Sequence, residues 1–88
     1  MSRILIKTNL KNIPYSSGVY FFKDENGHFL YIGKASNLKN RVSSYKKTAD
    51  PRIQKMLKFA SQIDWQETDS EVEALILESL LIKKHQPK

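Results

Sequence analysis

Two aromatic segments separated by an Asn-Gly pair constrain the fold of this chain more than any other feature of its sequence. They are residues 18–23 (Gly-Val-Tyr-Phe-Phe-Lys) and residues 29–34 (Phe-Leu-Tyr-Ile-Gly-Lys), and Asn26-Gly27 lies between them. Aromatic and β-branched residues favour strands, and Asn-Gly suits the two central positions of a type I′ turn, where both residues need a positive φ. The sequence therefore predicts an antiparallel β-hairpin with a two-residue turn.

This turn would set which side chains share a face of the hairpin. The expected pairs are Lys23 with Leu30, Phe22 with Tyr31 and Tyr20 with Gly33. Directly paired residues point to the same side, so Tyr20 and Tyr31 should lie together. Both faces of the hairpin are apolar, so we expect helices on both sides of the sheet. Gly33 opposite Tyr20 leaves a space where a ligand could approach the backbone; alternatively, the two tyrosines are ordinary core residues.

The rest of the chain predicts three helices and one more strand. A helix is expected from Ser36 or Asn37 to Lys47, and a second should begin at Asp50-Pro51, with Asp50 as the N-cap. Residues 63–68 are short enough for a third strand. Ser70 and Glu73 form a capping box for a last helix, which should run toward Lys84 before Pro87. The order ββααβα is that of an α/β (α+β) domain with a small sheet.

Composition limits the class of protein and of partner. The 88 residues are enough for one domain, and the absence of cysteine excludes disulfides and Cys-ligated zinc. No apolar run approaches the ~20 residues of a membrane span. The formal charge of +6 fits a polyanionic partner such as nucleic acid. Basic residues gather between positions 38 and 58, and acidic residues between 59 and 82, so one face should suit phosphates better than another.

Two charged residues fall within apolar stripes of the expected helices. Arg41 shares an i, i+3, i+4, i+7 pattern with Leu38, Val42 and Tyr45, and a guanidinium at such a position needs an anion or must reach the edge of the helix. Glu78 lies among apolar residues of the last helix and must be paired or hold a metal. The two could form a structural salt bridge, or Arg41 could bind a phosphate and Glu78 a metal ion.

The motifs taken together resemble the GIY-YIG nuclease module. The resemblance is carried by Gly18-Val19-Tyr20, Tyr31-Ile32-Gly33-Lys34-Ala35, Asn37-Leu38-Lys39-x-Arg41 with Tyr45, and the segments 68–78 and 81–88. Within that superfamily the chain is most similar to the N-terminal nuclease domain of UvrC, the incision protein of the bacterial excinuclease ABC. The family implies a three-stranded antiparallel sheet flanked by helices. It also implies a single domain over residues 1–88, the N-terminal fragment of a longer repair protein. Family members usually continue past the final proline with a Tyr-Asn pair whose Asn lines the active site, so a chain that stops at Lys88 is expected to be weakly active.

The family's catalytic set falls on six residues of this chain: Tyr20, Tyr31, Lys34, Arg41, Tyr45 and Glu78. Glu78 would bind one divalent cation, Mg²⁺ or Mn²⁺, because a symmetric two-metal site would require more carboxylates. Tyr31 would be the general base, and Arg41 would stabilise the transition state. Six further basic residues would contact the DNA backbone without reading bases: Lys39, Lys46, Lys47, Arg52, Lys55 and Lys58.

The resemblance thus predicts a metal-dependent DNA endonuclease domain. It would make the 3′ incision of bacterial nucleotide excision repair, together with the helicase-like excinuclease protein UvrB. The expected location is the cytoplasm, and no membrane is expected as a partner. The isolated domain is expected to be a monomer. Two alternatives stay open. One is another GIY-YIG endonuclease of the structure-specific or homing type, and the other is a DNA-binding module that does not cut.

Overall fold

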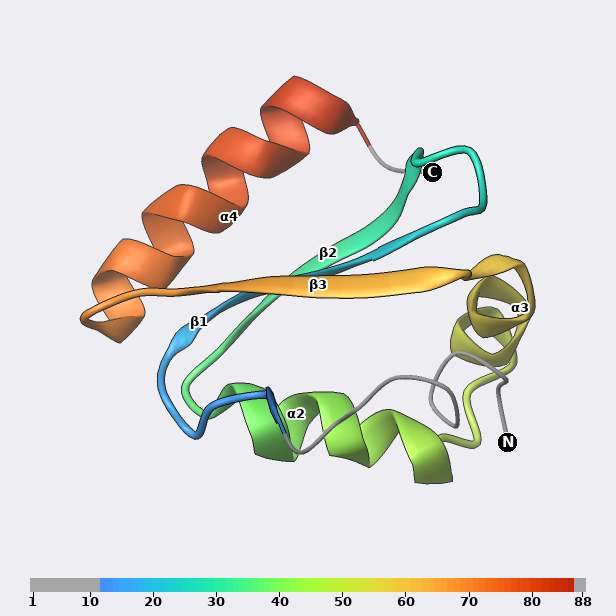
Figure 1. The fold of residues 1–88 in the computed structure, drawn as a ribbon, viewed down its shortest axis with the longest axis horizontal. Coiled ribbons are helices and arrows are strands. Elements are labelled where there is room, and N and C mark those ends of the chain that lie inside the picture. Colours follow the sequence, from blue (N-terminus) through green and yellow to red (C-terminus); the bar gives the residue numbers. More distant parts are fainter. Residues whose placement is uncertain (1–11, 87–88) are drawn as a thin grey trace.

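The computed structural model describes residues 12–86, which form a three-stranded antiparallel sheet with helices on both faces (Figure 1). The strands and helices, in chain order, are β1 Gly18–Lys23, β2 Phe29–Ala35, α2 Leu38–Ser44, the 3₁₀ helix η2 Tyr45–Lys47, α3 Pro51–Phe59, β3 Gln62–Glu67 and α4 Glu71–His85. The order ββααβα and the sheet predicted from the sequence are therefore confirmed. The strands lie in the order β2-β1-β3, so β2, which carries the second aromatic segment, is an edge strand.

The register of the hairpin agrees with the prediction where it affects the tyrosines. Tyr20 pairs with Gly33 and Phe22 pairs with Tyr31. The register shifts after Phe22, where a bulge makes Lys23 the partner of residue 29 in place of the expected residue 30. The predicted pairs are thus correct except at the end of the strands nearest the turn.

The turn itself is longer than the two residues predicted. The carboxylate of Asp24 accepts hydrogen bonds from the backbone N–H groups of Asn26 and His28, both at 2.9 Å, and Gly27 N–H donates to the carbonyl oxygen of Asp24 at 3.0 Å. Gly27 alone in this turn has a positive φ, of 84°, whereas a type I′ turn needs two such residues. Asp24 therefore stabilises a wider loop because its carboxylate replaces backbone partners.

Side-chain alternation divides the core into two layers. On one face the fully buried Phe22 packs with Leu38 and Val42 of α2 and Leu57 of α3. On the other face a smaller cluster forms between the strands and α4. Its residues are Val19, Phe21, Phe29 and Ile32 of the strands and Ala74, Leu77 and Leu81 of α4. Figure 1 shows this arrangement, with α2 and α3 on one side of the sheet and α4 on the other.

Helices α3 and α4 begin at the caps that the sequence predicts, whereas α2, expected from Ser36 or Asn37 to Lys47, is α-helical only from Leu38 to Ser44 and continues as η2. The side chain of Asn37 caps α2, Asp50 precedes Pro51 at the start of α3, and Ser70 Oγ accepts a hydrogen bond from Glu73 N–H at the start of α4. The glutamate of this capping box bonds the N–H of Asp69, one residue before the expected partner. Such caps stabilise a helix by about 1 kcal/mol each.

Helix α4 ends where Gln86 takes a left-handed conformation, with φ 44°, and donates to the carbonyl oxygen of Ile82 at 2.8 Å. Pro87, the expected stop signal, lies outside the described residues. Strand β3 begins and ends one residue before the predicted range 63–68. None of the helices within residues 12–86 combines the length and the apolar character needed to cross a membrane.

Candidate active site

Three tyrosines from three different elements meet on the α2 side of the sheet. Tyr20 lies on β1, Tyr31 on β2 and Tyr45 at the start of η2. Their ring centroids are separated by 6.2 Å (Tyr20 to Tyr31), 5.7 Å (Tyr20 to Tyr45) and 6.3 Å (Tyr31 to Tyr45), and the hydroxyl oxygens of Tyr20 and Tyr45 are 2.6 Å apart. The structure therefore brings together the three phenols that the sequence singles out.

The missing side chain of Gly33 makes room for one of these phenols. A Cβ atom at Gly33 would lie 2.5 Å from the hydroxyl oxygen of Tyr20 and 2.6 Å from its Cζ. The sequence predicted that a ligand could approach the backbone here, and that prediction is wrong because the ring of Tyr20 itself fills the space. Gly33 thus sets the position of the Tyr20 hydroxyl.

Burial makes two of the phenols poor acids. It raises the pKa of Tyr20 to about 12, although the hydrogen bond with Tyr45 and the nearby charge of Arg41 act in the opposite direction. Burial and the hydrogen bond with Tyr20 also raise the pKa of Tyr45. Both groups therefore stay neutral near pH 7, where they can donate or accept hydrogen bonds, and the phenolate form that a general base would need is hardly populated.

Arg41 stands at the edge of this cluster. Leu38 and Val42 of the expected stripe are fully buried and Tyr45 is half-buried, but Arg41 is exposed. Its side chain therefore reaches the edge of the helix, which is one of the two alternatives that the sequence left open, because a guanidinium reaches solvent at lower cost than it enters the core. Its charge lies close enough to Tyr20 to act on the pKa of that phenol. An exposed guanidinium beside neutral phenols can accept a phosphate group.

Glu78 and Lys34 lie on the opposite face of the sheet from the phenols. Glu78 is half-buried on α4, and Lys34 is exposed and pairs with Val19, a residue of the α4-side core. Neither Arg41 nor Glu78 takes part in an ion pair within residues 12–86, so the salt bridge considered from the sequence is not formed. Since β2 is an edge strand that carries both Tyr31 and Lys34, side chains from the two faces could meet around its free edge.

A pocket of about 260 Å³ lies where β2 ends against the first turns of α4. Its lining residues are Lys34, Ala35, Ser36, Glu71, Val72, Ala74 and Leu75. Lys34 is the member of the catalytic set in this pocket, and Glu78 is not part of the lining. The pocket thus lies at the C-terminal end of β2, on the α4 side of the sheet.

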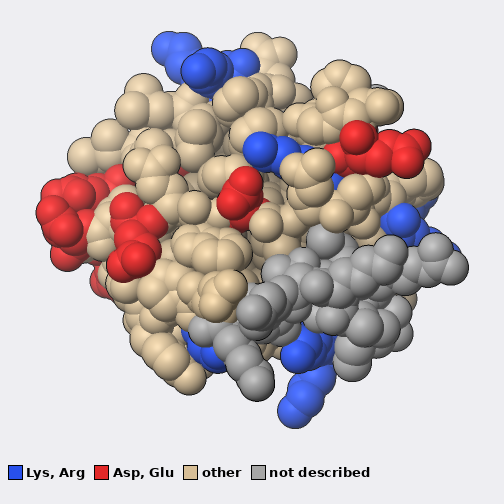
Figure 2. Space-filling model, viewed as in Figure 1, with Lys and Arg blue, Asp and Glu red and all other residues tan. Residues whose placement is uncertain are grey.

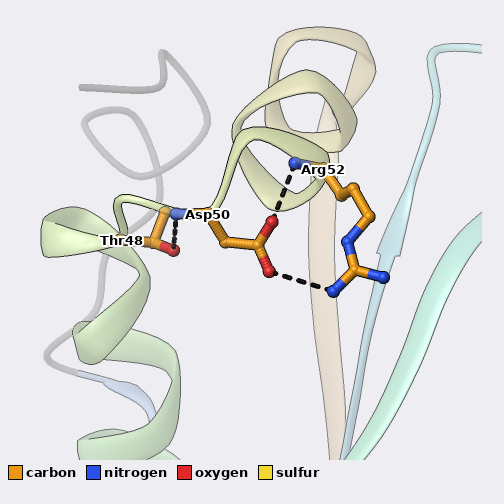
Figure 3. A network of polar contacts seen from close by, with 3 residues as sticks. All are labelled: Thr48, Asp50 and Arg52. Atoms are coloured by element: carbon orange, nitrogen blue, oxygen red, sulfur yellow. Dashed lines mark hydrogen bonds and ion pairs between the residues drawn. The ribbon is translucent and has the colours of Figure 1, made fainter.

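The six basic residues predicted to contact DNA belong to α2, η2 and α3, all on the phenol side of the sheet. Two of them have protein partners. The ammonium of Lys39 lies over the ring of Tyr15, 5.6 Å from its centroid. Arg52 Nη2 is 3.4 Å from the carboxylate of Asp50, which also caps α3 (Figure 3). The side chain of Arg52 is 91% exposed in spite of this pair, so it keeps a solvent-facing charge.

One contact near the site was missed by sequence reasoning. Ser16 Oγ donates a hydrogen bond of 2.7 Å to the carboxylate of Glu67, whose place in the sequence suggests only a solvated strand end. This bond ties the segment before β1 to the end of β3. The two residues are 51 positions apart in the chain, and no local pattern announces such a pairing.

A known protein family matches most of this chain. The model of the UvrC-like GIY-YIG domain covers residues 16–88. The chain belongs to that family. The recognition made from the motifs, that of a GIY-YIG nuclease domain of the UvrC type, is thereby confirmed.

Individual relatives agree with the family. The chain is 51% identical over 82 residues to the UvrABC system protein C of Methanococcus maripaludis, and 55% identical over 86 residues to that of Methanospirillum hungatei. These matches cover 91% and 96% of the chain, but the chain spans only 16% of the length of either relative.

A solved structure of similar size also matches. It is the GIY-YIG N-terminal endonuclease domain of UvrC from Thermotoga maritima bound to its catalytic divalent cation, magnesium. The TM-score is 0.87 at 36% identity, and the match covers 100% of this chain and 97% of the other. The fold described above is therefore that of a UvrC GIY-YIG endonuclease domain.

Proposed function

We propose that this chain is the endonuclease domain of a longer UvrC-type repair protein, and that it hydrolyses one phosphodiester bond of DNA with the help of a divalent cation. The observation that carries the proposal is the cluster of Tyr20, Tyr31 and Tyr45 beside the exposed Arg41. This cluster stands on a scaffold that superimposes on a metal-bound UvrC endonuclease domain. In the whole protein the cut would be the 3′ incision, made in the cytoplasm with the excinuclease protein UvrB.

The donor set of the chain fits a single Mg²⁺ or Mn²⁺. Within the described residues no group of three or more His, Cys, Asp or Glu side chains could hold a metal ion. Glu78 is a half-buried carboxylate without an ion-pair partner there. Mg²⁺ commonly takes one or two carboxylates and keeps several waters or phosphate oxygens, so one carboxylate is sufficient. When bound, such a cation would polarise the phosphate and stabilise the departing oxygen.

The phenols would divide the remaining work. Tyr20 and Tyr45 stay neutral because their pKa values are raised, so they would hold the attacking water and the phosphate by hydrogen bonds. Tyr31, on the edge strand and half-buried, is then the phenol left to orient the water, and it could take the proton of the water only after its own proton has left to solvent. This assignment supports the general base implied by the family resemblance.

The cations would bind and stabilise the phosphate. Arg41 would neutralise the charge that develops on the phosphate oxygens in the transition state. Lys34 would supply a second positive charge from the other side of β2. The basic side chains of α2, η2 and α3 would hold the DNA backbone, because they lie on the same side of the sheet as the phenols.

Nicking of supercoiled plasmid DNA tests the proposal. The protein should convert supercoiled DNA to open circles in the presence of Mg²⁺ or Mn²⁺ and not in excess EDTA. Cleavage without metal, or DNA binding without any cleavage in either metal, would count against it, and the second result would favour the non-cutting module. With a lesion-bearing duplex and UvrB present, a single cut on the 3′ side of the lesion would distinguish the repair nuclease from a structure-specific or homing endonuclease.

A further inference from the structure

Helix α4 is apolar on two sides, and residues 12–86 bury only one of them. Ala74, Leu77 and Leu81 pack against the sheet. Five large hydrophobic side chains of the same helix are 41% to 66% exposed: Val72, Leu75, Ile76, Leu80 and Ile82. In the described part of the chain the other exposed large hydrophobics are Tyr15 and Phe59, which lie on separate elements. A surface helix normally turns one apolar stripe to the core and polar residues to solvent, so the outer side of α4 is the exception.

The exposed residues follow the pattern of a helix-helix contact. At 100° per residue, Val72, Ile76, Ser79 and Lys83 fall in one row with spacings of four, three and four. Leu75 and Ile82 flank the row on one side, and Leu80 flanks it on the other. Rows with this spacing form the contact line of paired helices. We call these seven residues the outer seam of α4.

Charges are segregated along the same helix. The first turn carries Glu71 and Glu73, and the last turn carries Lys83, Lys84 and His85. Figure 2 shows the corresponding acidic surface where β3 passes into α4 and basic surface at the C-terminal end of α4, with uncharged surface between them. An antiparallel copy of α4 would place Glu73 near Lys84 of that copy, whereas a parallel copy would place like charges together. Antiparallel pairing also opposes the two helix dipoles.

We propose that the outer seam of α4 is a self-association surface, on which a second copy of this chain packs antiparallel with a two-fold axis near the middle of the helix. Fifteen residues make a helix about 22 Å long and about 10 Å wide. This footprint is far below the ~800 Å² per partner of a stable interface. The pair is therefore weak, and at low concentration the domain remains the monomer that the sequence predicts. The phenol cluster stays accessible in the pair because it lies on the other face of the sheet.

Cysteine cross-linking tests the proposal cleanly because the chain contains no cysteine. With the axis near residue 78, the two copies of residue 79 lie about 3 Å apart along the helices, and the two copies of residue 72 about 18 Å apart. A disulfide needs Cα atoms within about 7 Å. At sub-millimolar protein with oxidised glutathione, Ser79→Cys should therefore form covalent dimers roughly tenfold faster than Val72→Cys. Both residues are exposed, so the comparison isolates their position in the pair.

A second pair of variants separates a specific seam from general stickiness. Ile76→Glu puts a charge in the seam and should abolish the faster cross-linking of Ser79→Cys. Phe59→Glu makes the same change at another exposed hydrophobic, 62% accessible on α3, and should leave it unchanged. Circular dichroism of each variant checks that the fold is kept.

Two outcomes would overturn the proposal. Equal rates for Ser79→Cys and Val72→Cys would mean that the seam does not meet its own copy in antiparallel register. Its occupant would then be another partner, such as the remainder of a longer chain. Equal loss of cross-linking in Ile76→Glu and Phe59→Glu would show that the contact is nonspecific.

Discussion

The hydroxyl oxygens of Tyr20 and Tyr45 lie 2.6 Å apart, although the two residues are separated by 25 positions in the chain. The contact joins the central strand of the sheet to the 3₁₀ helix that follows α2. Burial, and not this contact, is the main reason why the pKa values of both phenols are raised; the hydrogen bond itself lowers the pKa of Tyr20 and raises that of Tyr45. The site is thus built around two phenols that stay neutral over the ordinary pH range.

The first prediction concerns the ionisation of Tyr20. Its pKa is raised from 10.0 to about 12. The neutral form is therefore favoured by folding, and the associated stability is complete below about pH 10 and is lost as the pH rises toward 12. The shift corresponds to on the order of 3 kcal/mol. Alkaline titration followed by tyrosinate absorbance should show late titration of two phenols, Tyr20 and Tyr45, and Tyr20→Phe should remove the amplitude of one of them.

The exposed Tyr15 provides the control for this titration. Tyr15→Phe removes a phenol that is 67% accessible, and the late amplitude should survive this change. A titration of Tyr20→Phe with the same late amplitude as the wild type would contradict the assignment of the raised pKa to this residue.

The second prediction concerns Gly33→Ala. The added Cβ would lie 2.5 Å from the Tyr20 hydroxyl oxygen, so the ring must move away. We expect a loss of about 1–3 kcal/mol in the free energy of unfolding, the usual cost of overpacking, and a loss of nicking activity. Urea denaturation and plasmid nicking measure the two effects.

Gly27→Ala is the matched control, because it adds the same methyl group far from the phenols. A Cβ at Gly27 would have nothing within 4 Å, but the residue has a φ of 84°. This variant should lose about 1 kcal/mol through backbone strain and keep its nicking activity per folded molecule. Equal activity losses in the two variants would mean that Gly33 does not position Tyr20.

Most of the fold could be predicted because its signals are local. The caps at Asp50 and Ser70 and the pairing of Tyr20 with Gly33 depend on residues near one another in sequence or on strand alternation. The prediction of a type I′ turn was wrong because the carboxylate of Asp24 accepts hydrogen bonds from backbone N–H groups of the loop. The turn preferences of Asn and Gly at the two central positions do not take into account a hydrogen-bonding side chain at a neighbouring position.

The residues of the proposed site come from the sequence, but their layout could not be predicted from it. The family resemblance chose the residues, and periodicity placed Tyr20 and Tyr31 on one face. Helical spacing alone could not show that Arg41 leaves the stripe for solvent, because a long side chain can leave the direction of its Cβ. Nor could it show that α4, and hence Glu78, covers the opposite face of the sheet from α2. The face of the sheet that α4 covers depends on how β3 and its connections cross the sheet.

The third prediction separates phosphate stabilisation from DNA binding. Arg41→Ala should reduce the nicking rate by about 10²–10³-fold, the usual effect of removing one transition-state donor. The stability should change little, since Arg41 is exposed. Arg52→Ala removes a guanidinium from α3 that is 91% exposed; it should weaken DNA binding modestly and reduce the slope of binding against salt concentration. Similar losses of nicking rate in both variants would show that Arg41 only binds the DNA backbone, as Arg52 does.

The fourth prediction concerns Glu78→Gln, which keeps the shape of the side chain and removes its charge. If Glu78 holds the cation, the variant should lose nicking at all practical Mg²⁺ and Mn²⁺ concentrations. It should also lose the broadening of nearby NMR signals that Mn²⁺ causes in the wild type. Glu25→Gln, in the exposed hairpin loop, should change neither property.

Because Glu78 and the phenols lie on opposite faces of the sheet, the residues broadened by Mn²⁺ also report where the cation binds. Signals from the edge strand β2 on both sides would place the metal around that edge, in reach of Arg41 and Glu78 together. Broadening confined to the acidic first turn of α4 would contradict the shared site.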